Sequence, residues 1–280
     1  MKKLITAVIL LVFVCRLSYA ARVDTIRVYS AAMHKEVPCV IVRPDVLLHG
    51  RTAGTHLPVV YLLHGHSGNY ADWISKVPAL KDYVDLYHII VVCPDGGFDS
   101  WYLDSPVTPE YRYETFVSKE LISYVDAHYP TIPDRAHRAI TGLSMGGHGA
   151  LFLAFRHTDR YGAAGSMSGG VDLRPFPDNW NIKGRLGTLQ EHPERWEKNS
   201  VVSLADSLKN GELKIAFECG VKDFFITVNR NLHKKLVKLG IDHDYTERPG
   251  QHTWEYWSNA LPYQLLFFHR FFAAAGVKTR

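Results

Sequence analysis

Hydrophobic residues follow two spacings along this chain, and both predict β-strands. In residues 23–29 and 37–42 apolar and polar positions alternate, which is typical of strands with one buried face and indicates an antiparallel pair. Residues 57–63 and 88–93 are instead almost continuously apolar, the pattern of strands covered on both faces. We expect four further strands at residues 138–141, 162–170, 212–220 and 244–247.

Between these strands, apolar residues recur at the spacing of amphipathic helices. The clearest case is residues 109–129, where Phe116, Leu121 and Val125 recur among charged residues. Because strands alternate with helices after the first pair, we expect an α/β fold. Its central sheet would be mostly parallel, with antiparallel N-terminal strands and helices on both faces. Further helices are expected at residues 149–155, 194–208 and 224–239, with an aromatic helix at the end of the chain.

The first twenty residues have the layout of a secretory signal. Residues 2–14 begin with two lysines and continue as an apolar run, and Ser18 and Ala20 are the small residues expected before a cleavage site. The run is too short to span a bilayer comfortably. We therefore expect residues 1–20 to be a signal peptide that is cleaved after Ala20. Residues 21–280 would then form one catalytic domain, secreted or periplasmic and without stable membrane association.

The charge of the chain gives little information about partners. The net charge is +4, and removal of Lys2, Lys3 and Arg16 with the signal reduces the 32 basic residues by three, to 29 against 28 acidic ones. A mature chain close to neutrality does not predict a nucleic-acid partner.

The cysteines do not form a recognisable disulfide or metal pattern. Cys15 allows a lipoprotein as an alternative, although Val14 stands where a lipobox normally has a small residue. The mature chain keeps Cys39, Cys93 and Cys219, an odd number without a CxxC pair. We expect buried free thiols.

The stretch 139–150, AITGLSMGGHGA, is the strongest chemical signal in the chain. It predicts a strand, a sharp turn and a helix, with Ser144 at the turn and glycines at positions 142 and 146. In a Gly-x-Ser-x-Gly elbow these two positions must be small so that the strand and the helix can approach closely. We interpret Ser144 as a nucleophile. The alternative is a glycine-rich helix start with a capping serine.

A second candidate functional loop follows the strand at 57–63. Its sequence, His64-Gly65-His66-Ser67-Gly68-Asn69, is typical of a loop that donates a backbone N–H to an oxyanion. We assign the two oxyanion-hole donors to the backbone N–H groups of His66 and Met145. A metal pair of His64 and His66 is the alternative, but no carboxylate motif accompanies it.

Serine needs a base and an orienting acid, and several residues compete for these roles. Asp223 and His252 each follow a predicted strand, and the order serine, acid, histidine is that of the α/β-hydrolase arrangement. The rivals fit less well. His243 starts a strand, His148 lies in the first turn of the elbow helix, Asp172 follows the elbow too closely and Asp206 lies in a helical pattern.

Substrate contacts are less specific in the sequence. Trp101, in a loop after the strand at 88–93, and Trp254, after His252, are candidates to line a substrate pocket. A lone aromatic residue in a loop also serves as a packing anchor. Residues 171–187 carry prolines and scattered charges, and we interpret them as an insertion near the site.

Together these motifs resemble the esterase D or S-formylglutathione hydrolase-like putative esterases, a family that includes feruloyl and acetyl-xylan esterases. The resemblance implies an α/β-hydrolase serine esterase with Ser144, Asp223 and His252 as its triad. His66 and the insertion depart from the family pattern. The matching motifs are His64-Gly65 with Trp73, Cys93-Pro94-Asp95-Gly96-Gly97, Gly142 to Gly147, Asp223, and Pro249-Gly250-Gln251-His252-Thr253-Trp254.

We therefore expect a secreted serine carboxylesterase that acts on a small-molecule or oligosaccharide ester, such as a feruloyl or acetyl ester of a carbohydrate. The expected mechanism requires no metal and no organic cofactor. Three alternatives stay open at this point: an acyltransferase of the mycolyltransferase type, a thioesterase like S-formylglutathione hydrolase, and a carbohydrate-binding relative without catalysis.

Overall fold

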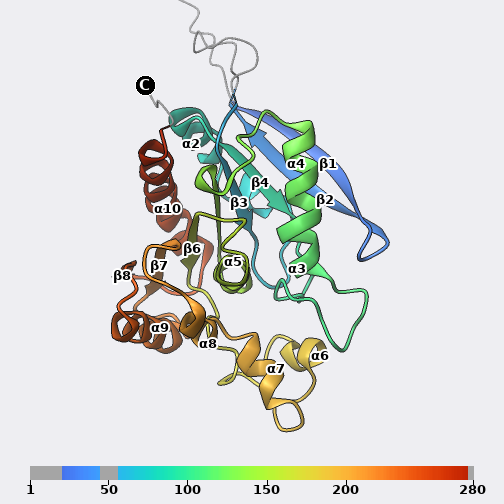
Figure 1. Cartoon of the computed structure of the whole chain (residues 1–280), viewed down its shortest axis with the longest axis vertical. Coiled ribbons are helices and arrows are strands. Elements are labelled where there is room, and N and C mark those ends of the chain that lie inside the picture. The colour runs from blue at the N-terminus through green and yellow to red at the C-terminus, as the bar shows by residue number, and fades with distance from the viewer. Residues whose placement is uncertain (1–20, 45–55, 277–280) are drawn as a thin grey trace, which may run out of the picture.

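The apolar strands form one sheet, whose order determines which loops meet. The computed structural model describes residues 21–44 and 56–276, and within them eight strands run in the order β1-β2-β4-β3-β5-β6-β7-β8 (Figure 1). Strand β2 is antiparallel to both β1 and β4, and all other neighbours are parallel. The strands are β1 (Arg22–Ser30), β2 (Lys35–Arg43), β3 (Val59–Leu63), β4 (Ile90–Pro94), β5 (Arg138–Gly142), β6 (Ala163–Met167), β7 (Lys214–Gly220) and β8 (Asp244–Arg248). The predicted α/β fold is confirmed, whereas the predicted signal peptide lies outside the described residues.

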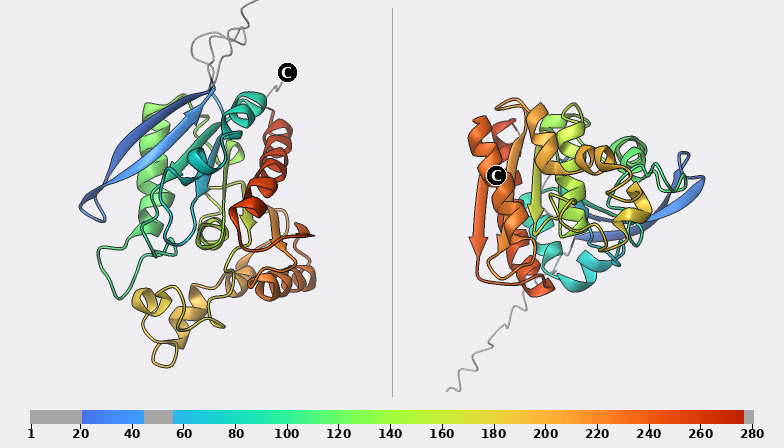
Figure 2. Two further views of the ribbon diagram at one scale, coloured as in Figure 1. Left: turned by 180° about the vertical axis from the view of Figure 1, so that it is seen from behind. Right: turned by 90° about the horizontal axis from the view of Figure 1, so that it is seen from below.

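The sheet is covered on both faces, as the continuous apolar strands predicted. In β3, Tyr61 and Leu63 belong to the core on one face, and Val60 and Leu62 to the core on the other, because successive side chains point to opposite sides. Helices α4, α5 and α9 pack on the first face, and α2 and α10 on the second (Figures 1 and 2). The α-helices are α1 (Asp72–Lys76), α2 (Leu80–Tyr87), α3 (Tyr113–Thr115), α4 (Leu121–His128), α5 (Met145–Arg156), α6 (Ile182–Leu186), α7 (Pro193–Lys198), α8 (Val201–Leu204), α9 (Ile226–Leu239) and α10 (Trp254–Ala274).

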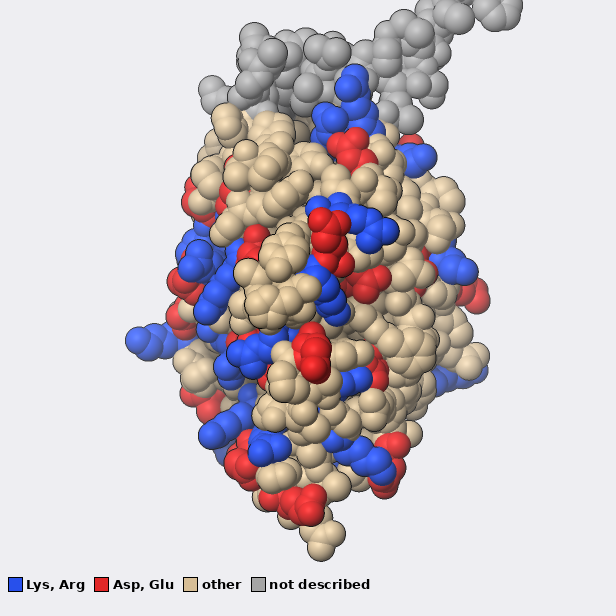
Figure 3. Space-filling view, turned by 90° about the vertical axis from the view of Figure 1, so that its right-hand side faces the viewer, with Lys and Arg blue, Asp and Glu red and all other residues tan. Residues whose placement is uncertain are grey.

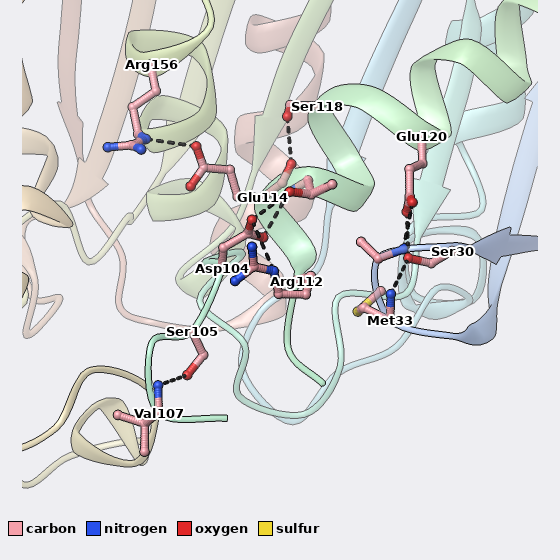
Figure 4. Close-up of polar contacts among 12 residues, drawn as sticks. Ser30, Met33, Asp104, Ser105, Val107, Arg112, Glu114, Ser118, Glu120 and Arg156 are labelled. Atoms are coloured by element: carbon pink, nitrogen blue, oxygen red, sulfur yellow. Dashed lines mark hydrogen bonds and ion pairs between the residues drawn. The ribbon is translucent and has the colours of Figure 1, made fainter. Parts of the chain in front are cut away.

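The helix predicted at residues 109–129 is present but not uniform. Helix α3 continues through the π-helical turn Phe116–Glu120 directly into α4. Within this segment the Ser118 hydroxyl donates to the carbonyl oxygen of Glu114 at 2.6 Å (Figure 4). The apolar positions Phe116, Leu121 and Val125 are all buried, as their spacing predicted.

The single helix expected at residues 194–208 was a wrong prediction. The chain forms α7, breaks at Asn199 and Ser200, and resumes as α8 and a short 3₁₀ turn at Ala205–Ser207. Ser200 has an extended backbone with φ −94° and ψ 124°, and its hydroxyl oxygen accepts the N–H of Leu173 at 3.1 Å. The helix is broken where the Ser200 side chain is bonded to the segment that follows β6, a tertiary contact that helical spacing does not encode.

One side of the molecule carries charges of both signs. On the side of the molecule that bears α3 and α4, lysine and arginine side chains are interspersed with aspartate and glutamate (Figure 3). No helix in the described part of the chain is both long and apolar enough to cross a bilayer.

Candidate active site

Ser144 lies at a strained turn between β5 and α5. Its backbone has φ 54° and ψ −117°, a conformation that few residues with a side chain adopt and that is held by neighbouring structure. The Ser144 N–H donates to the carbonyl oxygen of Met167 at 3.0 Å, which ties the turn to the end of β6. The turn therefore presents its side chain at the carboxyl end of the sheet.

Glycines 142 and 146 make this turn possible. A Cβ atom added to Gly146 would lie 2.5 Å from the carbonyl oxygen of His64, and one added to Gly142 would lie 2.6 Å from the carbonyl oxygen of Gly146. Both contacts are with backbone atoms, which cannot move aside cheaply. The elbow motif predicted small residues at these two positions. The structure explains this requirement, because the strand and the helix approach too closely for a side chain.

The structure brings Ser144, His252 and Asp223 into one hydrogen-bonded chain. Nε2 of His252 lies 2.8 Å from Oγ of Ser144, and Nδ1 of the same ring lies 2.8 Å from Oδ2 of Asp223. A carboxylate can only accept, so Nδ1 carries the proton and donates it to Asp223. Nε2 is then unprotonated and accepts the hydrogen bond of the Ser144 hydroxyl, the arrangement of a general base beside a nucleophile.

Asp223 and His252 are held by the loops after β7 and β8. Asp223 is 3% exposed, and its Oδ1 accepts the N–H of Phe225 at 2.8 Å. The His252 ring packs against Phe224 at 4.2 Å between centroids and perpendicular to Trp257 at 4.9 Å. These contacts restrict the imidazole to the orientation in which both nitrogens have partners.

The two residues assigned to the oxyanion hole flank the serine. His66 and Ser144 line the same cavity, and Met145 is the first residue of α5, so its N–H has no acceptor within the helix. The loop that carries His66 is fixed by the N–H of Ser67, which donates to the carbonyl oxygen of Phe98 at 2.7 Å. This arrangement can present two backbone donors to a developing negative charge.

His64 is a structural residue. Its Nδ1 donates to the carbonyl oxygen of Gly65 at 2.8 Å, and its Nε2 accepts the N–H of Gly96 at 2.7 Å. Burial lowers the pKa of His64, which keeps the ring neutral. Both nitrogens are therefore occupied within the chain. No group of three or more His, Cys, Asp or Glu side chains is arranged to hold a metal ion among the described residues.

The side chains of the rival histidines and acids are bonded to groups other than Ser144. The buried His148 has Nε2 2.8 Å from the carbonyl oxygen of Asn199, and His243 pairs with His233. The two acids are bound elsewhere: Asp172 forms an ion pair with Arg174, and Asp206 with Lys235.

Ser144 and His252 open into a cavity of about 590 Å³ whose walls combine four Trp and Phe rings with small and polar residues, Asp72 among them. Trp254 lines this cavity, as predicted. Trp101 does not: its side chain is 1% exposed and packs below the site, so the expectation that it contacts substrate is corrected. A loop position after a strand cannot distinguish an indole ring that faces the cavity from one that faces the core.

Three aromatic residues of the cavity wall were missed by sequence reasoning. Trp180, Phe224 and Trp257 all line the cavity. Phe224 directly follows Asp223, and Trp257 lies one helical turn after Thr253, so proximity to the triad was an available signal for these two. Trp180 lies in the insertion, where no periodic pattern indicated which side chain turns inward.

The fold and the site together define the class of protein. A serine at a strand-turn-helix elbow, bonded to a histidine and a buried aspartate at the carboxyl edge of this sheet, is the arrangement of an α/β-hydrolase serine esterase. Residues 30–268 match the family model described as putative esterase, and the chain belongs to that family.

Relatives and solved structures agree with this assignment. The chain is 29% identical over 254 residues to an acetyl esterase of Caldicellulosiruptor saccharolyticus, covering 84% of this chain and 94% of that protein. It is 32% identical over 264 residues to the diacylglycerol acyltransferase/mycolyltransferase Ag85A of Mycobacterium tuberculosis, covering 81% of this chain and 77% of the relative. Among solved structures, a ferulic acid esterase superposes with a TM-score of 0.78 at 27% identity, covering 91% of this chain and 99% of the other.

Proposed function

We propose that this protein is a secreted serine carboxylesterase that hydrolyses acyl esters of carbohydrates, with Ser144 as nucleophile, His252 as general base and acid, and Asp223 as the group that orients His252. The observation that carries the proposal is the continuous chain of two 2.8 Å contacts from Oγ of Ser144 through His252 to Asp223. This chain ends in a cavity that can admit an ester.

The proposed reaction has two halves. In the first, Oγ of Ser144 attacks the ester carbonyl carbon while Nε2 of His252 takes the hydroxyl proton, and the backbone N–H groups of His66 and Met145 bind the oxyanion. His252 then gives this proton to the leaving alcohol as the acyl-serine forms. In the second half, His252 takes a proton from the water that attacks the acyl-serine, then gives it to Oγ of Ser144 as the acyl–oxygen bond breaks, which releases the carboxylic acid and regenerates free Ser144.

The substrate class is supported by two independent features. Relatives at 29% and 27% identity are named an acetyl esterase and a ferulic acid esterase. The cavity presents Trp180, Phe224, Trp254 and Trp257, whose flat faces suit an aromatic acyl group or the apolar face of a sugar ring. We favour feruloyl or acetyl esters of oligosaccharides.

The proposed place of action rests on the N-terminal sequence. A basic start, an apolar run and small residues before Ala21 support export followed by cleavage after Ala20. Mass spectrometry of the exported protein should give a chain beginning at Ala21. A chain retaining the first twenty residues would contradict export by a cleaved signal.

The test of the catalytic assignment is Ser144→Ala. We expect it to abolish hydrolysis of p-nitrophenyl acetate with a thermal midpoint close to that of the wild type. Ser168→Ala is the matched control, because Ser168 is also buried with a positive φ of 51° yet does not line the cavity. The control should keep turnover within about a factor of three. Phenylmethylsulfonyl fluoride should add one sulfonyl group to the Ser144 peptide of the wild type and none to Ser144→Ala.

A second candidate activity is acyl transfer, which the 32% identity to a mycolyltransferase favours. In that reaction an alcohol replaces water in the second half of the cycle. The two activities are distinguished by measuring the products of acetyl-enzyme breakdown at increasing concentrations of methyl glucoside. A product ratio dominated by acetate at all concentrations supports hydrolysis, and a dominant acetylated glucoside supports transfer.

A further inference from the structure

The segment between β6 and α7 contributes one side chain to the catalytic cavity from outside the sheet. This segment, which contains α6, lies beyond the sheet at the lower end of Figure 1. From it, Trp180 reaches the cavity that also contains Ser144 and His252. Its ring is stacked on Phe224 with centroids 5.5 Å apart and an interplanar angle of 22°.

The backbone of Trp180 is strained. Trp180 has φ 47° and the following residue, Asn181, has φ 53°, so two consecutive residues with side chains occupy the left-handed region. Each costs roughly 1 kcal/mol or more relative to an ordinary conformation. Such a conformation persists only where surrounding contacts hold it in place.

A group of polar side chains, of which Asp99 and Arg185 are buried and Asn181 is exposed, provides those contacts. Arg185 donates from Nε and Nη2 to Oδ1 of Asp99 at 3.1 and 2.7 Å, and Asn181 donates from Nδ2 to Oδ2 at 2.6 Å. Asp99 and Arg185 are only 5% and 9% exposed. We call Asp99, Asn181 and Arg185 the clasp. A buried ion pair contributes orientation only when its remaining atoms are satisfied, and here both carboxylate oxygens have donors.

The clasp is attached to a second fixed loop. Nη1 of Arg185 donates to the hydroxyl oxygen of Thr108 at 2.8 Å, and the Ser105 hydroxyl donates to the carbonyl oxygen of Arg185 at 2.7 Å. Ser105 also accepts the N–H of Val107, and its neighbour Asp104 pairs with Arg112 at the start of α3 (Figure 4). The clasp therefore connects the insertion to the loop that leads into α3, on one of the two helix-covered faces of the sheet.

Trp101 completes the support. Its indole Nε1 donates to the carbonyl oxygen of Trp180 at 3.3 Å, and its ring lies 6.1 Å from that of Trp180. The buried Trp101 is thus a positioning residue for Trp180. Clasp and indole together hold a strained residue in one orientation, toward Phe224.

The position of Trp180 and Phe224 relative to His252 identifies which half of the ester these two rings contact. Nε2 of His252 must reach the oxygen of the leaving alcohol to protonate it, whereas the carbonyl oxygen turns toward the oxyanion loop. Phe224 covers the His252 ring at 4.2 Å, and Trp180 stacks on Phe224. An alcohol that leaves past His252 therefore lies beside the wall formed by Phe224 and Trp180.

We propose that Trp180 is the residue that selects the alcohol half of the ester, by packing against the apolar face of a sugar ring, and that the clasp positions it for this role. The proposal rests on the proposed function of the site and adds the residue that recognises the carbohydrate. It assigns the exposed Phe224 to the same wall.

The experiment compares two series of esters in the wild type and in Trp180→Ala. The alcohol series pairs ethyl acetate with an acetylated xylo-oligosaccharide, and the acyl series pairs methyl acetate with methyl ferulate. We expect Trp180→Ala to lower kcat/KM for the acetylated oligosaccharide by about tenfold relative to ethyl acetate, as loss of one apolar contact predicts. The acyl ratio, which is kcat/KM for methyl ferulate divided by kcat/KM for methyl acetate, should change less than about twofold. The alcohol ratio is kcat/KM for the acetylated oligosaccharide divided by kcat/KM for ethyl acetate. Trp180→Phe, which keeps a flat ring, should recover most of the wild-type alcohol ratio.

The clasp is tested with Asp99→Asn, alone and combined with Trp180→Ala. Asp99→Asn should shift the alcohol ratio in the same direction, and the double variant should shift it no further than Trp180→Ala, because both changes remove one interaction. Tyr29→Ala is the control: Tyr29 is 58% exposed on β1 and does not line the cavity, so its alcohol ratio should stay at the wild-type value.

Two outcomes would overturn the inference. An unchanged alcohol ratio in Trp180→Ala would remove Trp180 from recognition, and a change confined to the acyl ratio would place it on the other half of the ester. Failure of the proposed function is separate, since it would appear as absence of ethyl acetate hydrolysis in the wild type.

Discussion

The carboxylate of Asp223 lies 2.8 Å from Nδ1 of His252, although the two residues come from loops after different strands. Strands β7 and β8 are parallel neighbours, so their carboxyl ends deliver both loops to one edge of the sheet. The side chain of Asp223 has no exposed surface in this pair, and that of His252 is 14% exposed. Water therefore has little access to the bond that orients the imidazole.

Asp223→Asn should reduce kcat by roughly three to four orders of magnitude. An asparagine amide can donate to Nδ1 and thereby favour the tautomer that has its proton on Nε2, which cannot accept the Ser144 proton. Steady-state hydrolysis of p-nitrophenyl acetate measures the effect. Asp206→Asn is the matched control, since Asp206 pairs with Lys235 on the surface, and its rate should stay within about twofold of the wild type. A near-normal rate for Asp223→Asn would assign the acid to another residue.

Gly146→Ala should destabilise the protein and disrupt the site together. The added methyl group would lie 2.5 Å from the carbonyl oxygen of His64, so the elbow and the oxyanion loop would have to separate. We expect a loss of about 1–3 kcal/mol in the free energy of unfolding, measured in urea, and a large fall in esterase activity. In Gly211→Ala the new methyl group meets no atom within 4 Å and bears only the cost of φ +80°. That control should lose about 1 kcal/mol and keep its activity. Full activity in Gly146→Ala would show that the close approach is not required.

The strand pattern was predictable because burial on two faces leaves a continuous apolar run, as in β3 and β4. Residues that follow such strands share one edge of a parallel sheet, and this explains why Ser144, Asp223 and His252 could be selected from among many serines, acids and histidines. The place of each residue directly after a predicted strand allowed this choice. The residue type alone did not, because the chain contains many serines, acids and histidines.

Contacts between segments distant in sequence could not be predicted in the same way. The helix expected at residues 194–208 is interrupted where Ser200 is bonded to Leu173, and Trp180, which lines the cavity, precedes Asn181, which is bonded to Asp99. In both cases the partner lies outside any local window. The burial of Trp101 has the same origin, since its place under the elbow depends on how the loop after β4 folds back onto α5.

The three cysteines of the described chain should be unreactive in the folded protein. Cys39, Cys93 and Cys219 are free and buried, and burial raises the pKa of Cys39 to about 12 and the pKa of the other two as well. A thiol attacks disulfide reagents only as an exposed thiolate. Ellman's reagent at pH 8 should therefore label the native mature protein very slowly and release three equivalents after unfolding in guanidinium. Rapid labelling of the native protein, or fewer than three equivalents after unfolding without reductant, would contradict this.

His148 should make the protein less stable in mild acid. It is fully buried on α5, and burial lowers its pKa to about 4, although the hydrogen bonds that the protonated ring donates to the carbonyl oxygens of Asn199 and Trp101 oppose this shift. Above the ordinary value of 6.5 the ring is neutral in both the folded and the unfolded chain, so it adds no pH dependence there. As the pH falls from 6.5 toward 4 the unfolded chain binds a proton that the folded chain does not, and the free energy of unfolding decreases. Below about 4 both states are protonated and this contribution stops changing.

Urea unfolding at pH 7.5 and 4.5 measures this contribution when the wild type is compared with His148→Gln. The glutamine amide can still donate to the carbonyl oxygen of Asn199 but does not titrate. Other buried histidines whose pKa is lowered by burial, such as His64, change both proteins alike and cancel in the comparison. We expect the wild type to lose about 2–3 kcal/mol more than the variant between the two pH values, since each pKa unit corresponds to about 1.4 kcal/mol. Equal losses in the two proteins would show that His148 can be protonated in the folded state, and that the space between α5 and Asn199 admits water.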